Sequence, residues 1–277
     1  MRPAIGAAVA LFLLGGSANA QSREFSRTVD LDSGGALRIE GAKGSMRITP
    51  WEQPRVEVRA RIERPDDVDD EYGRRAVEAT TIAVTGDRKA VSVISDYSAV
   101  PVLSGRRRWQ DRREPAVHYE VRAPRRINLS VDSDRGPITV SGFEGTLDVV
   151  IDRGELELTD VAGDLRVEID RGERSRIAGV RGSLRLEADR TDVDIDAQAL
   201  DRDSRIQVDR GDVELRIPDA QRLTVRTDIS RRGEFHTDFP IQWTSSDLRR
   251  STGHINGGGA ELFVESNRAT IELRRRR

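Results

Sequence analysis

Five aspartates at nearly constant spacing are the residues of this sequence whose pattern could do chemistry. Asp-Arg-Gly occurs at residues 134–136, 152–154, 170–172 and 209–211, and a degenerate Asp-Arg-Thr lies at residues 189–191. Successive copies begin 18, 18, 19 and 20 residues apart. A column of carboxylates offers the oxygen ligands that Ca²⁺ prefers, but here an arginine beside each aspartate would weaken a cation site. The pattern therefore favours a repeated structural corner and predicts no metal site.

Other catalytic patterns are missing from the sequence. The three histidines, His118, His236 and His254, are scattered without metal-ligand spacing, and there is no Gly-x-Ser-x-Gly nucleophile elbow. There is no cysteine either, which excludes thiol chemistry and disulfides. We therefore predict a protein that is not an enzyme and has no cofactor. Polysaccharide-cleaving β-helix enzymes remain an alternative, since they too use outer carboxylates and arginines, but no break in the repeat builds a pocket.

The segments between the corners have the pattern of strands buried on one side. Apolar residues fall at every second position, as in Leu147, Val149 and Ile151, and then Leu156 and Leu158. The positions between them are mostly charged, which gives one buried face and one wet face. The alternation and the frequent glycines exclude a helix across this region.

A second set of glycines, Gly145, Gly163 and Gly182, falls between the Asp-Arg-Gly copies, so each period holds two strands and two turns. We predict an all-β fold, a β-solenoid or parallel β-helix-like structure with coils of 18–20 residues. An antiparallel meander stays open as the alternative. In the solenoid the Asp-Arg-Gly corners stack in one file. Each arginine pairs with the acid of its own or the next coil, and each aspartate accepts a main-chain N–H at its corner.

The first half of the chain is also predicted to be mainly β, although the repeat is not visible there. Residues 36–48 resemble one early coil of the same kind, and residues 55–63 form a strictly alternating strand. A short helix is predicted around residues 70–78. Residues 82–85 and 90–94 flank Gly-Asp-Arg-Lys and predict a hairpin.

One compact basic cluster, Ser-Gly-Arg-Arg-Arg-Trp-Gln-Asp-Arg-Arg-Glu-Pro, lies at residues 104–115. Its five arginines and Trp109 would suit a phosphate-rich or stacking partner. Asp111 and Glu114 dilute the charge, which favours a solvated loop. Across the whole chain 46 basic residues balance 48 acidic ones, which argues against a nucleic-acid binder.

Residues 1–20 have the layout of a cleavable signal peptide: a positive start at Arg2, an apolar run, and Ala-Asn-Ala at residues 18–20. The run is too short for a permanent transmembrane anchor, and without cysteine there is no lipidation site. We therefore expect a periplasmic or secreted protein. The expected division is a signal peptide (1–20), a β-rich N-terminal region (21–126) and a solenoid (127–277) that is continuous with it.

The order of these elements resembles the bacterial DUF4097 family, also called the "putative adhesin" family. The segments that carry the resemblance are VHYEVRAP at 117–124, the repeats from residue 127, and INGGGAELFVESNRATIEL at 255–273. The resemblance implies a β-solenoid in the cell envelope or at the cell surface, and it brings no catalytic residues. Family members usually have Ser-Gly or Asn-Gly where this chain has Asp-Arg-Gly.

The function that follows is a non-enzymatic envelope or surface protein whose charged solenoid face contacts a protein or glycan of the envelope. A self-associating scaffold is the structural alternative. The predicted contact residues are the arginines of the corners together with the tryptophan of the basic cluster: Arg135, Arg153, Arg171, Arg190, Arg210 and Trp109.

Overall fold

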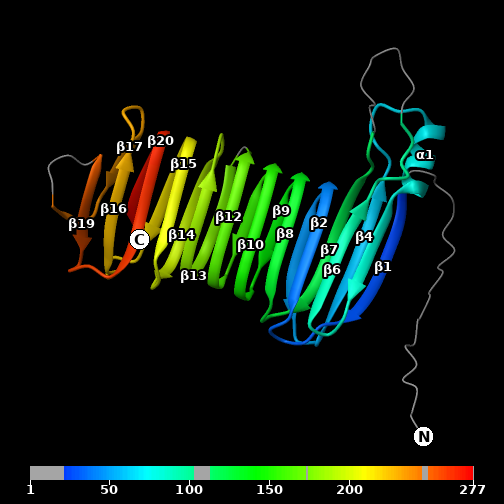
Figure 1. Cartoon of the computed structure of the whole chain (residues 1–277), viewed down its shortest axis with the longest axis horizontal. Coiled ribbons are helices and arrows are strands. Elements are labelled where there is room, and N and C mark those ends of the chain that lie inside the picture. The colour runs from blue at the N-terminus through cyan, green and yellow to red at the C-terminus, as the bar shows by residue number, and fades with distance from the viewer. Residues whose placement is uncertain (1–21, 103–112, 173, 245–248, 277) are drawn as a thin grey trace, which may run out of the picture.

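In the computed structural model the chain forms one elongated stack of β-coils, running from β1 and α1 at one end to β19 at the other (Figure 1). The structure describes residues 22–102, 113–172, 174–244 and 249–276; the expected signal peptide lies outside them. The strands are β1 (Ser22–Asp30), β2 (Ala36–Lys43), β3 (Met46–Trp51), β4 (Arg55–Glu63), β5 (Thr81–Gly86), β6 (Ala90–Asp96), β7 (Ala116–Pro124), β8 (Asn128–Arg135), β9 (Ile138–Ser141), β10 (Glu144–Arg153), β11 (Leu156–Thr159), β12 (Ala162–Arg171), β13 (Arg174–Ala188), β14 (Asp192–Leu200), β15 (Ser204–Ile217), β16 (Leu223–Ile229), β17 (Glu234–Thr237), β18 (Gln242–Trp243), β19 (Arg250–Ile255) and β20 (Ala260–Arg275).

Each period of the repeat forms one coil with a strand on either side. On the first side, β10 pairs in parallel with β8 and β12, which places Leu147 beside Leu129 and Leu165. On the second side, β11 pairs in parallel with β9 and β13. Consecutive strands of the chain therefore lie on opposite sides, and strands one period apart are neighbours. The predicted solenoid is confirmed, and the antiparallel meander is excluded for this region.

Three long strands turn a corner and belong to both sides. The first part of β13 pairs with β11 and β14, and its second part pairs with β12 and β15. β15 pairs with β20 along its whole length, from Ser204 beside Leu262 to Ile217 beside Arg275. β13 and β15 thus continue through the corners at Gly182 and Gly211, whereas the degenerate corner at residues 189–191 lies between β13 and β14.

The N-terminal end contains a coil in register with the repeats. β6 and β7 pair with this coil in parallel, and antiparallel strands lie beyond them. β2 pairs in parallel with β8, and β3 pairs in parallel with β9, which confirms the early coil at residues 36–48. β4 pairs antiparallel with β7 and β1, and β5 and β6 form the predicted hairpin. The predicted helix is α1 (Asp70–Ala79), whose first turn is capped by the side chain of Asp69.

At the C-terminal end the last strand returns into the stack. β20 lies between β15 and β16, with parallel pairing on both sides, and β19 closes the edge antiparallel to β16. Residues 223–255 therefore lie closer to the C-terminal end of the stack than the last strand of the chain does. The segment at 255–273 does form a coil, but it is not the outermost one.

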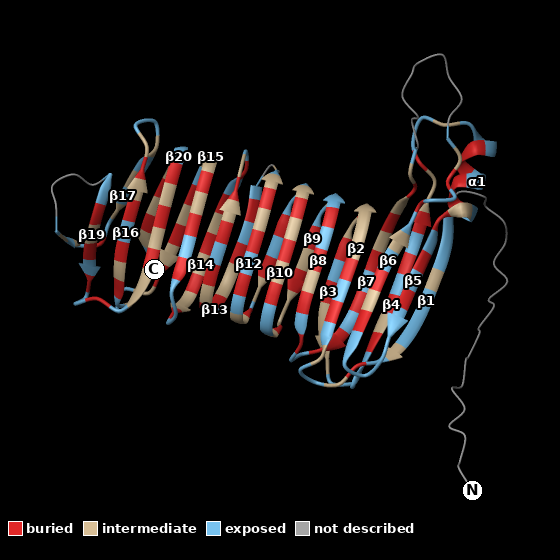
Figure 2. Ribbon diagram, viewed as in Figure 1, coloured by how far each residue is buried: buried red, intermediate tan, exposed pale blue. Residues whose placement is uncertain are grey.

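The core is a column of aliphatic side chains between the two sides. Figure 2 shows buried residues alternating with intermediate or exposed ones along most strands. Leu147, Val149 and Ile151 of β10 are at most 1% exposed, while the residues between them face solvent. Burial of one such side chain stabilises the fold by roughly 1.5–3 kcal/mol, far more than an exposed ion pair, so the aliphatic column supplies most of the stability.

Candidate functional site

The Asp-Arg-Gly corners stack directly above one another. Arg153 lies in register with Arg135 and Arg171, and the N–H of Gly154 donates a 3.0 Å hydrogen bond to the carbonyl of Arg171 in the next coil. A side chain on Gly154 would collide with the carbonyl oxygen of Gly136 in the coil before it. Glycine is needed here because the corners touch, as well as for its positive φ.

The corner aspartates and arginines form the ion-pair ladder that the sequence predicts. Arg190 bonds Asp189 of its own coil at 3.0 Å and Asp170 of the preceding coil at 2.9 Å. Arg210 repeats this arrangement with Asp209 and Asp189, both at 3.1 Å. Each arginine at this end of the ladder thus joins two coils, which holds the coils in register.

The ladder changes the acidity of its members. A hydrogen bond from Arg171 lowers the pKa of Asp170 below its usual value, and a second from Arg190 acts in the same direction. The hydrogen bond to Asp170 raises the pKa of Arg190 in turn. Asp170 and Arg190 therefore both stay charged at neutral pH.

One expectation about the corners was wrong. We expected the aspartates to accept main-chain N–H groups, but in the described residues their hydrogen bonds come from side chains. Asp152 receives one from Arg153, and Asp209 receives them from Arg210, Asn267 and Arg268. The main-chain N–H of the corner glycine instead binds the next coil, so the backbone stacks without help from the carboxylate.

The predicted contact residues fall into three groups. Arg153, Arg171, Arg190 and Arg210 belong to the ion-pair ladder, and Arg135 lies in the same column. Arg135 and Arg153 also line a hollow of about 510 Å³ with Lys43 and Arg113. Trp109 lies outside the described residues. The structure therefore gathers the five arginines along one corner.

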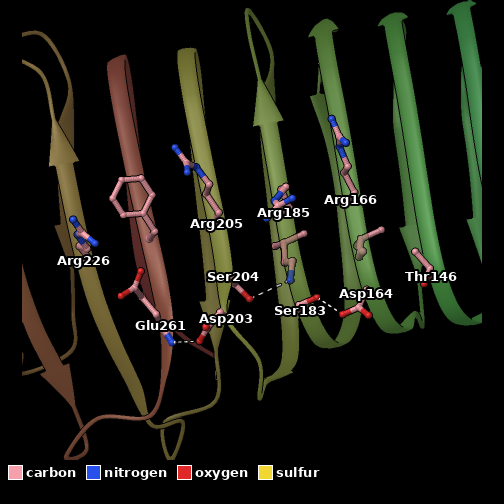
Figure 3. Close-up of a pocket in the computed structure, with 13 residues that line it drawn as sticks. Thr146, Asp164, Arg166, Ser183, Arg185, Asp203, Ser204, Arg205, Arg226 and Glu261 are labelled. Atoms are coloured by element: carbon pink, nitrogen blue, oxygen red, sulfur yellow. Dashed lines mark hydrogen bonds between the residues drawn. The ribbon is translucent and has the colours of Figure 1, made fainter.

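A groove of about 600 Å³ on the first side of the solenoid holds a second set of arginines. Arg166, Arg185 and Arg205 come from β12, β13 and β15 and lie in direct register. Figure 3 shows them side by side on adjacent strands with Arg226 further along. The groove is thus crossed by a row of cations that runs from coil to coil.

Phe263 fills the one position of this row that is not arginine. It lies in register with Arg205 on one side and Arg226 on the other. The Arg205 guanidinium carbon is 4.6 Å from the Phe263 ring centroid, and that of Arg226 is 5.6 Å away. Such cation–π contacts contribute roughly 0.5–1 kcal/mol at exposed sites, and here they hold the two guanidinium groups in place.

The acids of the groove are mostly engaged within the protein. Asp164 accepts a 2.6 Å hydrogen bond from Ser183 and pairs with Arg202 at 2.7 Å. Asp203 accepts the main-chain N–H of Glu261 at 2.8 Å (Figure 3). We call the four arginines Arg166, Arg185, Arg205 and Arg226 the arginine row.

Sequence reasoning missed the arginine row, although a signal was present. Leu-Arg-Val-Glu at 165–168 and Leu-Arg-Leu-Glu at 184–187 place arginine at the same outward position of successive coils. The Asp-Arg-Gly motif indicates a functional surface at the corner, whereas these arginines lie in the middle of their strands. Aligning the repeats by their buried leucines would have found them.

In the described residues, no three side chains of the metal-ligating types come close enough together to hold an ion. The described part of the chain also has no helix with the length and apolar character needed to cross a bilayer.

Comparison with known proteins gives a family and several distant structures. The Toastrack DUF4097 family model matches residues 125–274. A "putative adhesin" from Parabacteroides merdae is 10% identical, with a TM-score of 0.38, covering 91% of this chain and 96% of the other. A "putative cell adhesion protein" from Clostridium sporogenes is also 10% identical, with a TM-score of 0.37, covering 92% and 100%. A "putative lipid binding protein" from Parabacteroides distasonis is 10% identical as well, with a TM-score of 0.37, covering 92% and 97%.

No curated protein matches the chain in sequence. The family match covers more than half of the chain and includes the coils from β8 to β20. The chain belongs to the Toastrack DUF4097 family.

Proposed function

We propose that the chain is a non-enzymatic protein of the bacterial cell envelope or surface that presents its charged solenoid face to a protein or glycan. The observation that carries this proposal is the coil register, which repeats the same charged side chain at strand spacing along an open surface. A catalytic site needs different groups that converge on one point. A repeated surface suits a partner that is itself extended.

The proposal includes export. Residues 1–20 have the charge, apolar run and small-residue ending of a secretory signal, and we place the mature chain in the periplasm or outside the cell. The lack of cysteine in the sequence fits a fold stabilised by its aliphatic column alone.

The corner ladder is the contact surface that we propose first. Its arginines are 41–48% exposed, and an exposed ion pair contributes only about 0–1 kcal/mol. A carboxylate or phosphate of a partner can therefore replace an internal aspartate at little cost. Arginine suits this exchange because its guanidinium binds two oxygens at once.

Reversing two adjacent ladder charges tests this surface. Arg153→Glu with Arg171→Glu should abolish retention of envelope components on the immobilised protein, while the circular dichroism spectrum stays unchanged. Arg47→Glu with Arg176→Glu, on the outer face of the second side, is the matched control and should retain them as the original protein does. Unchanged retention by the ladder variant would contradict the proposed surface, and loss of fold would show that the ladder is structural only.

A further inference from the structure

The arginine row presents positive charge at a fixed repeat. Arg166, Arg185 and Arg205 occupy equivalent positions on neighbouring strands, and neighbouring strands lie roughly 4.8 Å apart. Arg226 continues the row beyond Phe263. The row therefore runs along the solenoid axis, perpendicular to the strands, and can be followed by one extended chain.

Part of this charge is not neutralised by the protein. Within the described part of the chain, the side chains of Arg185 and Arg226 make no ion pair or hydrogen bond, and Arg226 makes a cation–π contact with the Phe263 ring. Arg166 is 3.5 Å from Glu168 and 4.0 Å from Asp148, which are long ion pairs. Arg205 pairs with Glu265 at 2.7 Å. Because Asp164 and Asp203 are bound within the protein, the charges that the described residues leave open to a ligand in the row are those of Arg185 and Arg226.

The surroundings of the row restrict what the ligand can be. Glu168 and Glu187 lie two residues after Arg166 and Arg185, and Glu265 lies two residues after Phe263, all on the same outer face. This acidic edge repels a ligand with dense charge on both flanks, such as a nucleic acid. It accepts hydrogen bonds from hydroxyl groups. Phe263 is covered by guanidinium groups, so it is not free to stack on a nucleobase.

From these features we infer that the arginine row binds a linear acidic polysaccharide, with sugar carboxylates on the arginines and sugar hydroxyls on the flanking carboxylates. Arginine pairs with carboxylate in a bidentate geometry, and the Phe263 ring holds two of the guanidinium groups ready, which lowers the entropy lost on binding. This inference rests on the proposed function, because it names the class of glycan that the solenoid face would take.

Titration calorimetry with galacturonate oligomers tests the inference on the mature chain. Binding should be undetectable for the monomer, appear for oligomers that reach several arginines, and weaken at least tenfold between low and physiological salt. The same oligomers with methyl-esterified carboxylates should not bind, since they keep the sugar shape and lose the charge.

Arg185→Gln with Arg226→Gln should weaken binding of the oligomer at least tenfold. Neither arginine has an acidic partner in the described residues, so the change leaves no carboxylate without its ion pair, and the fold should be retained. Arg47→Gln with Arg176→Gln removes two exposed arginines from β3 and β13 on the other side and should leave the affinity unchanged.

Three results would overturn the inference: equal binding of the methyl-esterified oligomer, unchanged affinity of the Arg185→Gln/Arg226→Gln variant, or binding of polyphosphate as tight as that of the acidic sugar. A salt-sensitive dimer formed by the original protein through this face would also overturn it, because a second copy would then be the occupant. If galacturonate fails but envelope components are still retained through the ladder, the inference fails and the proposed function stands.

Discussion

Replacing Gly163 with alanine should lower the free energy of unfolding by about 3 kcal/mol or more. Gly163 belongs to the second set of corner glycines, with Gly145 and Gly182, and has a φ of 135°. An added Cβ there would collide with the carbonyl oxygen of Gly145 in the preceding coil. The two coils would have to separate locally, which also weakens the pairing of β10 with β12. Urea denaturation followed by circular dichroism measures the change.

Gly34→Ala is the matched control for this corner. Gly34 also has a positive φ, 85°, but a Cβ there would have no atom within 4 Å. The substitution carries only the conformational strain, about 1 kcal/mol. If Gly163→Ala costs no more than Gly34→Ala, the corners of successive coils are not in contact and the stacked arrangement is wrong.

Val149→Ala should destabilise the protein by about 1.5–3 kcal/mol, because Val149 is fully buried in the aliphatic column. Val150 is the next residue of β10 and faces the outer surface, where it is partly exposed. Val150→Ala removes the same two methyl groups and should cost less than about 1 kcal/mol. Equal effects in urea denaturation would contradict the assignment of the two faces.

The solenoid itself could be predicted because two independent sequence patterns, alternating apolar residues and periodic glycines, both indicate the repeat. Alternation along the strands set the buried face, and glycine at a fixed period set the corners. Both are local properties of the chain, and both survive in the structure, as Gly145 beside Gly163 illustrates. The ion-pair ladder followed from the same reasoning, since stacked aspartates need a neighbouring positive charge.

The two ends of the solenoid could not be predicted from the same patterns. β16 and β20 have equally good alternation, and nothing in either segment says that β20 lies between β15 and β16. The same holds for β4, which alternates as a coil strand would but pairs antiparallel with β7. The order of strands depends on contacts between segments far apart in the chain, which a local pattern does not carry.

The arginine row shows the same limit at the level of the site. Each of its arginines is an ordinary outward-facing residue of a strand that is buried on one face only. Successive arginines of the row are 19, 20 and 21 residues apart in the sequence. Phe263 joins the row from a strand 58 residues after Arg205. Only the register of the coils brings these side chains together, so the row becomes visible when that register is known.

Cysteine cross-linking tests the stacking of the coils most directly, and the chain suits it because it has no cysteine of its own. Thr139 lies beside Glu157 on parallel β9 and β11, at the roughly 4.8 Å strand spacing that a disulfide can span. Thr139 and Thr146 belong to consecutive strands, β9 and β10, on opposite sides of the solenoid. Under mild oxidation, Thr139→Cys/Glu157→Cys should form an intramolecular disulfide, detected by mass spectrometry, and Thr139→Cys/Thr146→Cys should not. The reverse result would show consecutive strands paired as a hairpin and would contradict the solenoid.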